Sequence, residues 1–387
     1  MLLLDLSHTS HTRARTGIQR VARTLQSALG SGALAVTHDP YLEAWRPLEP
    51  WEQTNLTAEA ASEKRGTAWP LAARWRGRFR RVLSRPAALP PAEGIIVPEV
   101  FSSAVAAALP ALFAATAGPR VAVFHDAIAL KFPEFTPPKT VARFPPYLRE
   151  LLRFDGIAAN SEDSRASLAD YWHWLGVPNP PPVAAIPLGV DLPDFHLMSE
   201  SPPGPRPIVL SVGSIEGRKN HLALLEACER LWAGGTQFEL RLVGLAHPQT
   251  GRVALERIHA LQAAGRPLRY DGPLGDAAVN AAYAECTLTV YPSLIEGFGL
   301  PVLESLAHGR PCLCSAGGAI GESARGGGCV MLEEMEPANL ATALGRLLAT
   351  PAEVTALAAQ ARARTFKTGK HYAAELVTWL RTLSRRP

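Results

Sequence analysis

Short apolar runs alternate with helical patterns along most of the chain. In the first half, the runs with the character of buried strands are GIIVP (94–98), RVAVF (120–124), GIAAN (156–160) and PVAAIP (182–187). The stretch SEDSRASLADYWHWLG, which starts at Ser161, opens with a serine and two acids, as helices often do. MLLLDL at the start predicts another buried strand and not a signal peptide, because no basic region precedes its apolar burst. This alternation predicts an α/β fold with parallel sheets and crossover helices.

The rhythm restarts after a proline-rich segment, MSESPPGPRP (198–207), which predicts an interdomain linker. The later strand and helix patterns are PIVLSVG, NHLALLEACERLWAGG, QFELRLVG, PLRYDGPL, DAAVNAAYAEC, LTVYPS, LPVLESLAHG and RPCLCSA. KHYAAELVTWLRTL (370–383) predicts a final amphipathic helix. We therefore expect two Rossmann-like domains, residues 1–200 and 201–367, that face a cleft, and a helix in 368–387 that packs back toward the first domain. Ligands of such sheets bind beyond the carboxyl ends of the strands.

Composition agrees with a soluble globular protein of this size. At 387 residues the chain is too long for one ordinary core, which favours two domains. It is 47% hydrophobic and 19% charged, and no apolar run approaches the roughly 18 residues that would span a bilayer. The cysteines are Cys228, Cys286, Cys312, Cys314 and Cys329, and none forms a CxxC pair. We interpret all five as small core residues in a reducing compartment.

Candidate chemistry is concentrated in YPSLIEGFGLPVLESLAHGRP (291–311). Glu296 and Glu304 flank a glycine-rich turn in which Pro301 marks the expected start of a helix. Upstream, SVGSIEGRKNHLALLEA (211–227) is another strand, turn and helix pattern, and its turn carries Arg218 and Lys219. Taken singly, these groups have simpler interpretations: Glu296 as an electrostatic cap, Glu304 as a solvated residue and the cations as a solvated turn. Adjacent cations at the end of a strand are also what a diphosphate needs.

Together, SVGSIEGRKN and PSLIEGFGLPVLESLAHGRP resemble the C-terminal domain of retaining glycosyltransferases of family four, which have the GT-B fold. The resemblance extends to IAANSEDSRASL, AIPLGVD, VFHD and TGIQRVARTL, and covers nearly the whole chain except roughly residues 40–92. It implies an N-terminal acceptor-binding domain and a C-terminal domain that binds a nucleotide sugar. As a set these motifs are highly specific, whereas any one alone is not.

The resemblance implies roles for individual residues of the second domain. Arg218 and Lys219 would hold the diphosphate and neutralise the charge that grows on the leaving group. Glu296 would bind hydroxyls of the transferred sugar, and Glu304 would bind the ribose. The other expected donor-binding positions are Gly213, Gly272, Leu274, Phe298, Gly299 and Leu300. The amides of the last three would help to place the sugar and the phosphate.

In the first domain, the resemblance places His125 of VFHD opposite the reacting sugar. Without it, a histidine at the end of a buried strand is more often a hydrogen-bonded core residue. Ser161 and Gly17 would lie near the donor, Gly17 in a turn that approaches the diphosphate or the acceptor. His8 and His11 are spaced by three residues, which is a weak metal pattern, so we assign no metal.

We expect no cofactor. The segment AGGAIGE (316–322) has Ala316 where a nicotinamide-binding fingerprint needs its first glycine. The resemblance implies retention at the anomeric carbon, and we favour front-side departure of the nucleotide diphosphate over double displacement. Fixed cations would replace a divalent metal, so catalysis should survive a chelator.

For the donor, we expect a hexose, with GDP-mannose first, because His125, Ser161, Lys219, Glu296 and Glu304 are together similar to those of lipid-linked mannosyltransferases of this family. UDP-glucose, UDP-N-acetylglucosamine and dTDP-rhamnose are alternative donors. Two further alternatives are a sugar-nucleotide 2-epimerase and a non-catalytic sugar-nucleotide-binding module. The expected acceptor is a lipid-linked glycan, on a polyprenyl diphosphate, or a surface polysaccharide.

A strongly basic segment interrupts the N-terminal domain. The net charge is +4, but residues 64–85 contain only basic charges: Lys64, Arg65, Arg74, Arg76, Arg78, Arg80, Arg81 and Arg85. Trp75, Phe79, Val82 and Leu83 form an apolar stripe at helical spacing among them. This pattern suits a helix on an anionic membrane surface. The alternatives are nucleic-acid binding, which we do not favour, and a stripe packed on the domain. We expect a cytoplasmic protein, peripheral on the inner face of the membrane.

Overall fold

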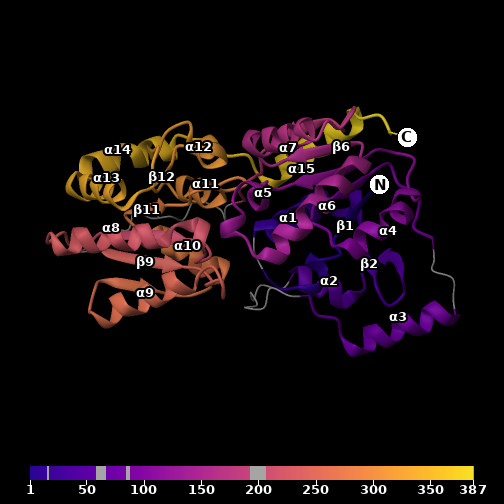
Figure 1. Ribbon diagram of the computed structural model, residues 1–387, viewed down its shortest axis with the longest axis horizontal. Helices are drawn as coiled ribbons and strands as arrows, with labels where there is room; N and C mark the ends of the chain where they lie inside the picture. The colour runs from indigo at the N-terminus through magenta and orange to yellow at the C-terminus, as the bar shows by residue number, and fades with distance from the viewer. Residues whose placement is uncertain (15–16, 58–66, 84–87, 192–205, 387) are drawn as a thin grey trace. The chain divides into compact units, whose positions relative to one another are not determined.

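The computed structural model describes residues 1–14, 17–57, 67–83, 88–191 and 206–386 (Figure 1). The chain forms two compact units. The first contains Met1–Ala127, Ala142–Gly189 and Lys367–Pro387, and the second contains Ile128–Val141 and Val190–Phe366. The segment Ile128–Val141 thus lies in the second unit and not, as the sequence suggested, in the first. The expected boundary at residue 200 and most of the expected linker lie outside the described residues.

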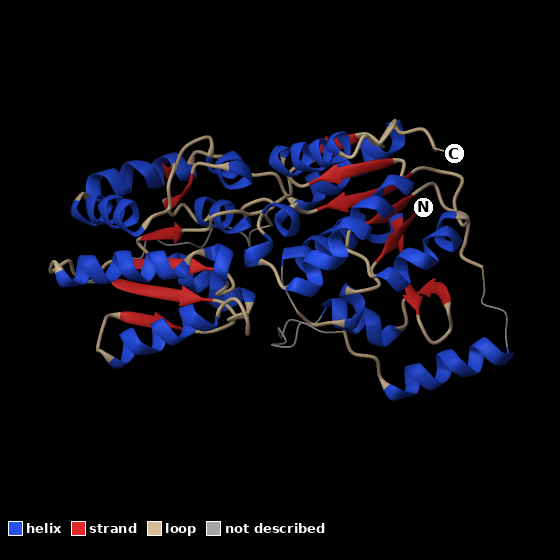
Figure 2. Ribbon diagram, in the orientation of Figure 1, coloured by secondary structure: helices blue, strands red, loops and turns tan. Residues whose placement is uncertain are grey.

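The first unit is built on a seven-stranded sheet in the order β3-β2-β1-β4-β5-β6-β7 (Figure 2). Its strands are β1 (Leu2–Asp5), β2 (Ala33–Asp39), β3 (Ala44–Pro47), β4 (Ile95–Val97), β5 (Arg120–Phe124), β6 (Gly156–Ala159) and β7 (Val183–Ala185). Only the β2–β3 pair is antiparallel. Strands β4, β5 and β6 are buried along their whole length, which explains why they read as unbroken apolar runs. The structure confirms the strands expected at MLLLDL and at 94–98, 120–124, 156–160 and 182–187.

Helices accompany this sheet at each crossover. They are α1 (Gly17–Leu29), α2 (Pro50–Thr57), α3 (Leu71–Leu83), α4 (Ser103–Phe113), α6 (Pro138–Glu150, whose first turn belongs to the second unit), α7 (Glu162–Trp174) and α15 (Gly369–Thr382), with short 3₁₀ turns η1 (Thr9–His11), η2 (Gly30–Gly32) and η4 (Leu151–Arg153). The helix expected at 370–383 is α15, and it packs against α1. A Cβ at Gly156 would lie 2.7 Å from the Trp379 ring, so α15 also closes on the start of β6.

The second unit is built on a six-stranded parallel sheet in the order β10-β9-β8-β11-β12-β13. The strands are β8 (Ile208–Val212), β9 (Glu239–Val243), β10 (Leu268–Tyr270), β11 (Leu288–Tyr291), β12 (Cys312–Ser315) and β13 (Cys329–Leu332). The helices are α5 (Ile128–Lys131), α8 (His221–Ala233), α9 (Arg252–Ala263), α10 (Asp276–Glu285), α11 (Leu300–Ala307), α12 (Gly318–Ala324), α13 (Pro337–Ala349) and α14 (Pro351–Arg362), with 3₁₀ turns η3 (Pro133–Phe135) and η6 (Gly217–Lys219). This order is that of a doubly wound dinucleotide-binding fold.

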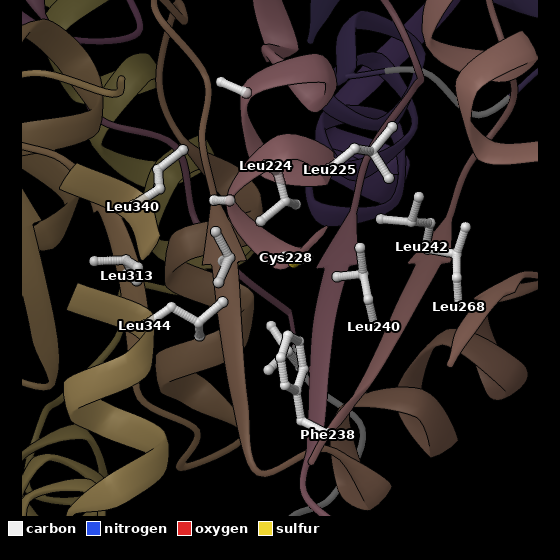
Figure 3. Close-up of a cluster of buried hydrophobic side chains, with 14 of the residues drawn as sticks. Leu224, Leu225, Cys228, Phe238, Leu240, Leu242, Leu268, Leu313, Leu340 and Leu344 are labelled. Carbon is white, nitrogen blue, oxygen red and sulfur yellow. The ribbon is translucent and has the colours of Figure 1, made fainter. Parts of the chain in front are cut away.

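The main core of the second unit lies between the sheet and helices α8, α9 and α13. Leu224 and Cys228 of α8 face Leu240 of β9, while Leu340 and Leu344 of α13 lie near Leu313 (Figure 3). Burial of this apolar surface is the main favourable contribution to the stability of the unit. The sheet that positions the candidate site is therefore a rigid support.

The structure reports on two further expectations. Among the described residues, no helix is long and apolar enough to cross a membrane. All five cysteines are free thiols; Cys228, Cys286, Cys312 and Cys314 are buried and Cys329 is half-buried.

Candidate active site at the switch point of the second sheet

The sheet order places the two candidate motifs side by side. Strand β8 pairs with β9 on one side and with β11 on the other, so the chain winds outward in opposite directions from the β8–β11 pair. The turn with Arg218 and Lys219 follows β8, and the loop with Glu296 follows β11. Ligands of open α/β sheets bind at such a switch point, beyond the carboxyl ends of the strands.

Arg218 and Lys219 converge on the carboxylate of Glu296. Nη1 of Arg218 lies 2.6 Å from Oε2 of Glu296, and Nζ of Lys219 lies 2.6 Å from Oε1. Arg218 also contacts Glu216, whose Oε1 lies 2.8 Å from Nη2. The backbone N–H of Leu294 donates to the Arg218 carbonyl at 2.9 Å, which ties the two loops together. The ion pairs replace the simpler interpretations of Glu296 as a cap and of the cations as a solvated turn.

The Glu296 carboxylate is held charged although its side chain is only 10% exposed. Burial alone would raise its pKa, but the Arg218 and Lys219 cations lower the pKa of Glu296 to about 2. Within the described residues, Oε1 of Glu296 has no hydrogen bond beside its ion pair with Lys219. This oxygen can therefore accept a hydrogen bond from a ligand.

Of the two cations, Lys219 has the charge that burial disfavours more. Burial, with a smaller contribution from Arg218, lowers the pKa of Lys219, and pairing with Glu296 opposes this only in part. Its Nζ donates to the Tyr291 hydroxyl at 2.5 Å and lies 4.6 Å from the centre of that ring. Although burial opposes it, Glu296 raises the pKa of Arg218, which keeps its charge. An incoming anion would relieve the poor solvation of Lys219.

The glycine-rich turn is anchored to a neighbouring helix. Gly299 precedes α11 with φ +112°, a conformation that favours glycine, and a Cβ there would lie 3.1 Å from Oγ of Ser323. Ser323 in α12 donates that hydroxyl to the Phe298 carbonyl at 2.7 Å. Helix α11 starts at Leu300, one residue before the expected start at Pro301. The first amides of such a helix lack partners within the helix and attract anions and hydroxyl oxygens.

Glu304 lies one turn into α11 and is buried, so its interpretation as a solvated residue is wrong. The Tyr283 hydroxyl lies 3.4 Å from Oε2 of Glu304. The Tyr283 ring stacks on His308, with centroids 4.6 Å apart. Glu304 of α11 thus lies against Tyr283 of α10.

The remaining donor-binding candidates lie at the same ends of the strands. Gly213 follows β8, and a Cβ there would be 3.7 Å from Nζ of Lys219. Gly272 follows β10, and its carbonyl accepts from the Gly244 amide at 2.8 Å. Leu274 packs against the buried cluster that contains Tyr283. All the expected donor residues of the second unit therefore surround the carboxyl ends of β8, β10 and β11.

In the first unit, His125 follows β5 and both its ring nitrogens are engaged. Nε2 donates to the Pro98 carbonyl at 2.7 Å, so Nδ1 is the acceptor for the Asn160 amide at 2.9 Å. Burial lowers the pKa of His125, which favours the neutral ring. Ser161 is buried and caps α7 by accepting from the Ser164 amide at 3.1 Å. Gly17 is exposed at the start of α1.

Several neighbours of these residues were not expected from the sequence. In the second unit they are Glu216, Tyr291, Tyr283, Ser323 and Phe135, whose ring would lie 3.2 Å from a Cβ at Gly217. In the first unit, the switch point between β1 and β4 holds two buried acids, Asp5 and Glu99. Burial, reinforced by Glu99, raises the pKa of Asp5 to about 7. An acid at the end of one apolar strand and another two residues after a second apolar strand were the signal that could have revealed this pair.

Glu99 organises the turn after β1. Its carboxylate accepts from the backbone amides of His8 and Thr9, each at 2.8 Å. His11 is buried, with Nε2 2.7 Å from the Glu52 carboxylate and Nδ1 2.7 Å from the Ser7 carbonyl. His8 and His11 thus lie in a hydrogen-bonded network, and the absence of a metal in this region remains a prediction.

The comparisons with known proteins agree with this geometry. Residues 206–350 match the family Glycosyl transferases group 1. The chain is 26% identical over 336 residues to a serotype-specific mannosyltransferase, WbdA, of Escherichia coli; this match covers 81% of the chain but only 38% of WbdA. Sucrose-phosphate synthase from Thermosynechococcus elongatus is similar in structure, with a TM-score of 0.67, 18% identity and 98% of both chains covered. HepE from Anabaena, in complex with UDP, is similar in structure too, with a TM-score of 0.67, 17% identity and 99% of both chains covered.

The two α/β units have the GT-B fold of these solved structures. Within it, residues 206–350 form a domain of the Glycosyl transferases group 1 family. The expected fold class is therefore confirmed, and the match of residues 206–350 supports the expected glycosyltransferase family, while retention at the anomeric carbon stays a prediction.

Proposed function

We propose that the chain is a glycosyltransferase that moves a hexose from a nucleoside-diphosphate sugar to a glycan acceptor. The observation that carries the proposal is the cluster of Arg218, Lys219 and Glu296 at the β8–β11 switch point. Two adjacent cations that share the Glu296 carboxylate form a site that a diphosphate can enter by exchange. The group 1 family match of this unit supports the same function.

The proposed reaction assigns each group a step. The diphosphate of the donor contacts Arg218 and Lys219, which neutralise the negative charge that grows on the leaving group. The bond between the anomeric carbon and the diphosphate oxygen breaks, and its electron pair leaves with the nucleoside diphosphate. The acceptor hydroxyl oxygen bonds to the same face of the sugar and gives its proton to the leaving phosphate. The product retains the anomeric configuration, and no metal is needed.

Binding of the diphosphate would also change the partners of the Glu296 carboxylate. Its two oxygens now face Arg218 and Lys219. When phosphate oxygens take over part of that role, Glu296 becomes the acceptor for hydroxyls of the transferred sugar. Glu304, buried against Tyr283, binds the ribose, and the amides of Phe298, Gly299 and Leu300 complete the donor site.

Mannose from GDP-mannose is the donor that we favour. The similarity to the mannosyltransferase WbdA supports it, over 81% of this chain. UDP-glucose, UDP-N-acetylglucosamine and dTDP-rhamnose are the alternatives, and the solved complex of HepE contains UDP. The chain spans only about two fifths of the length of WbdA (38%), so the activity of the whole relative is not transferred to it.

A thermal-shift series with GDP, UDP and dTDP, each with and without its hexose, tests the donor site. A ligand that binds only the folded state raises the unfolding midpoint by mass action. A higher unfolding midpoint with GDP and GDP-mannose supports mannose as the transferred sugar. A higher midpoint with UDP and its sugars instead would assign a UDP-sugar donor. No change in the unfolding midpoint with any of these nucleotides contradicts the proposed function.

Product analysis without an acceptor separates transfer from 2-epimerisation, because only an epimerase releases a new sugar nucleotide.

The acceptor that we propose is a glycan on a lipid carrier, met at the inner face of the membrane. Helix α3 carries the argument, because Trp75 and Phe79 are 67% and 68% exposed and Leu71, Val82 and Leu83 are also exposed. The opposite face, with Ala73 and Gly77, is buried. The interpretation of the apolar stripe as packed on the domain is therefore wrong.

The arginines of α3 flank this stripe and partly face the protein. Glu49 pairs with Arg76 and Arg80, at 2.9 and 3.4 Å, and Arg78 lies 5.5 Å from the Tyr41 ring centre. Their charge is thus partly neutralised, so we propose that insertion of the apolar stripe drives binding and that the arginines add affinity for anionic lipid. Lys64, Arg65 and Arg85 lie outside the described residues.

Sedimentation with vesicles tests this surface. Vesicles of mixed neutral and anionic phospholipid should retain the protein at low salt, and purely neutral vesicles should retain less. No sedimentation with anionic vesicles contradicts the membrane proposal without affecting the donor site. Retention by duplex DNA instead would assign the surface to nucleic acid.

A further inference from the structure

Three cysteines of the second unit gather at one place in the sheet. Cys312 and Cys314 both belong to β12 and, two residues apart, point to the same face. Cys329 of the adjacent strand β13 is the direct partner of Cys312 in the register. The three sulfur atoms lie within 4.8 Å of one another. The sequence pattern of alternate cysteines showed only the first two.

The side chains packed around this thiol cluster are largely apolar. Leu306 of α11, Ile320 and Ala324 of α12, and Ala361 of α14 pack with the cysteines. In the part of the chain that the structure describes, no histidine or carboxylate joins the group. The half-buried Cys329 gives the cluster its contact with the outside.

The guanidinium of Arg364 lies beside the cluster. Nη1 and Nη2 of Arg364 donate to the carbonyls of Gly327 and Ser323, at 3.3 and 3.2 Å, which fixes the guanidinium near Cys329. Thiolates are the form of cysteine that binds metals.

We propose that Cys312, Cys314 and Cys329 bind one divalent thiophilic ion of the zinc and cadmium class. Three sulfurs at about 2.3 Å from one ion lie roughly 3.8 Å apart, so small side-chain rotations from the present spacing suffice. Three thiolates and a divalent ion leave one negative charge, which Arg364 balances. Binding forms three metal–sulfur bonds, and the protons of the thiols pass to solvent. This site is separate from the proposed transferase chemistry and does not depend on it.

The cluster differs from the other two cysteines of the same unit. Cys228 lies in the core of α8 and Cys286 follows α10, each fully buried and outside the group of three. These two cysteines behave as ordinary small core residues. They therefore provide matched controls for any measurement on the cluster.

Titration of the reduced, full-length protein with Cd²⁺ tests the site. We expect an ultraviolet sulfur-to-cadmium charge-transfer band that saturates at one ion per chain, and a rise in the unfolding midpoint with Zn²⁺. Cys329→Ala, at the half-buried position, should lower the affinity by at least about 10-fold, and Cys312→Ala should do the same. Cys228→Ala and Cys286→Ala should leave both signals unchanged.

Two results would overturn the site. One is a band of equal strength and affinity in Cys329→Ala, and the other is no band in the native protein. If Cys312→Ala does not fold, Cys329→Ala still decides the question, because its circular dichroism can be checked against the native spectrum before titration.

Discussion

The ammonium of Lys219 lies 2.6 Å from Oε1 of Glu296, on a loop from a different strand. The two residues face each other because β8 and β11 are neighbours in the sheet although they are far apart in the sequence. Each group compensates the other in a place where neither is well solvated. A charged ligand that competes for one of them must therefore alter the other.

Lys219→Ala should lower kcat/KM for the sugar nucleotide by roughly 10²–10³-fold, since an electrostatic stabiliser of the leaving group is lost. Release of nucleoside diphosphate measures this. Lys219→Arg is the matched control, because it keeps the positive charge and should retain more activity. Near-normal turnover in Lys219→Ala would remove the proposed role.

As the pH rises, the native protein should lose affinity for the donor at a pH below the ordinary lysine pKa. Burial lowers the pKa of Lys219, so its charge is lost as the pH rises through a value below the usual 10.5. Lys219→Arg should abolish this alkaline loss, because arginine stays protonated. Calorimetric titration with the nucleoside diphosphate across the alkaline range checks it.

Glu296→Gln should separate nucleotide binding from transfer. Without the carboxylate, the two cations are freer for phosphate, so the nucleoside diphosphate should bind as tightly as in the native protein or more tightly. Turnover should fall, by about 10-fold or more, because the amide is a weaker acceptor for sugar hydroxyls. Weaker nucleoside-diphosphate binding with unchanged turnover would contradict the assignment.

Glu296→Gln should also differ from the native protein in how its free energy of unfolding changes at acid pH. The Glu296 pKa is lowered from 4.5 to about 2, so its contribution to the free energy of unfolding is present above about pH 4.5 and is lost as the pH falls toward 2. The difference in the free energy of unfolding between native protein and Glu296→Gln should therefore shrink between pH 5 and 3. Urea unfolding at several pH values measures it. A constant difference would show that the carboxylate is not held charged by its partners.

His125 should give no acid limb at the ordinary histidine pKa of about 6.5. Its pKa is lowered by burial, and Nδ1 already accepts from Asn160. The profile of kcat/KM should stay level through this range in the native enzyme. In Asn160→Ala, where Nδ1 is free to take a proton, an acid limb should move toward neutral pH. An acid limb near 6.5 in the native enzyme would show that the ring is more exposed to protons than this geometry allows.

Replacing Trp75 and Phe79 together by serine should lower the vesicle-bound fraction strongly, because burial of two aromatic side chains contributes on the order of 3 kcal/mol or more. Vesicle sedimentation measures the loss, and donor-induced thermal shifts should stay unchanged. Val253→Ser is the matched control, since Val253 is an exposed apolar residue on α9 of the other unit. Equal sedimentation of the double variant and the native protein would exclude insertion.

The elements that the sequence predicts best are those buried on both faces. Strands such as β5 have continuous apolar runs, and the turn motifs around Lys219 and Glu296 are specific as a pair. Strand β2 was not expected, because Thr37, His38 and Asp39 interrupt its apolar pattern. Strand β13 follows three glycines, and no apolar pattern in the sequence predicted it.

The partners of site residues depend on long-range packing and were harder to expect. Tyr291 reaches Lys219 only because the sheet order places β11 beside β8. Ser323 reaches the Phe298 carbonyl from a separate helix. The proline-containing segment at 128–141 has no pattern that assigns it to the second unit, and only packing such as that of Phe135 near Gly217 does so.

The first unit is assembled from three separate stretches of chain, and the last of them is Lys367–Pro387. Its helix α15 packs on α1, near the other end of the sequence. During synthesis on the ribosome, the first unit therefore lacks one covering helix until the whole second unit has been made. The second unit can complete its own sheet earlier, so the order of folding is expected to run against the order of synthesis.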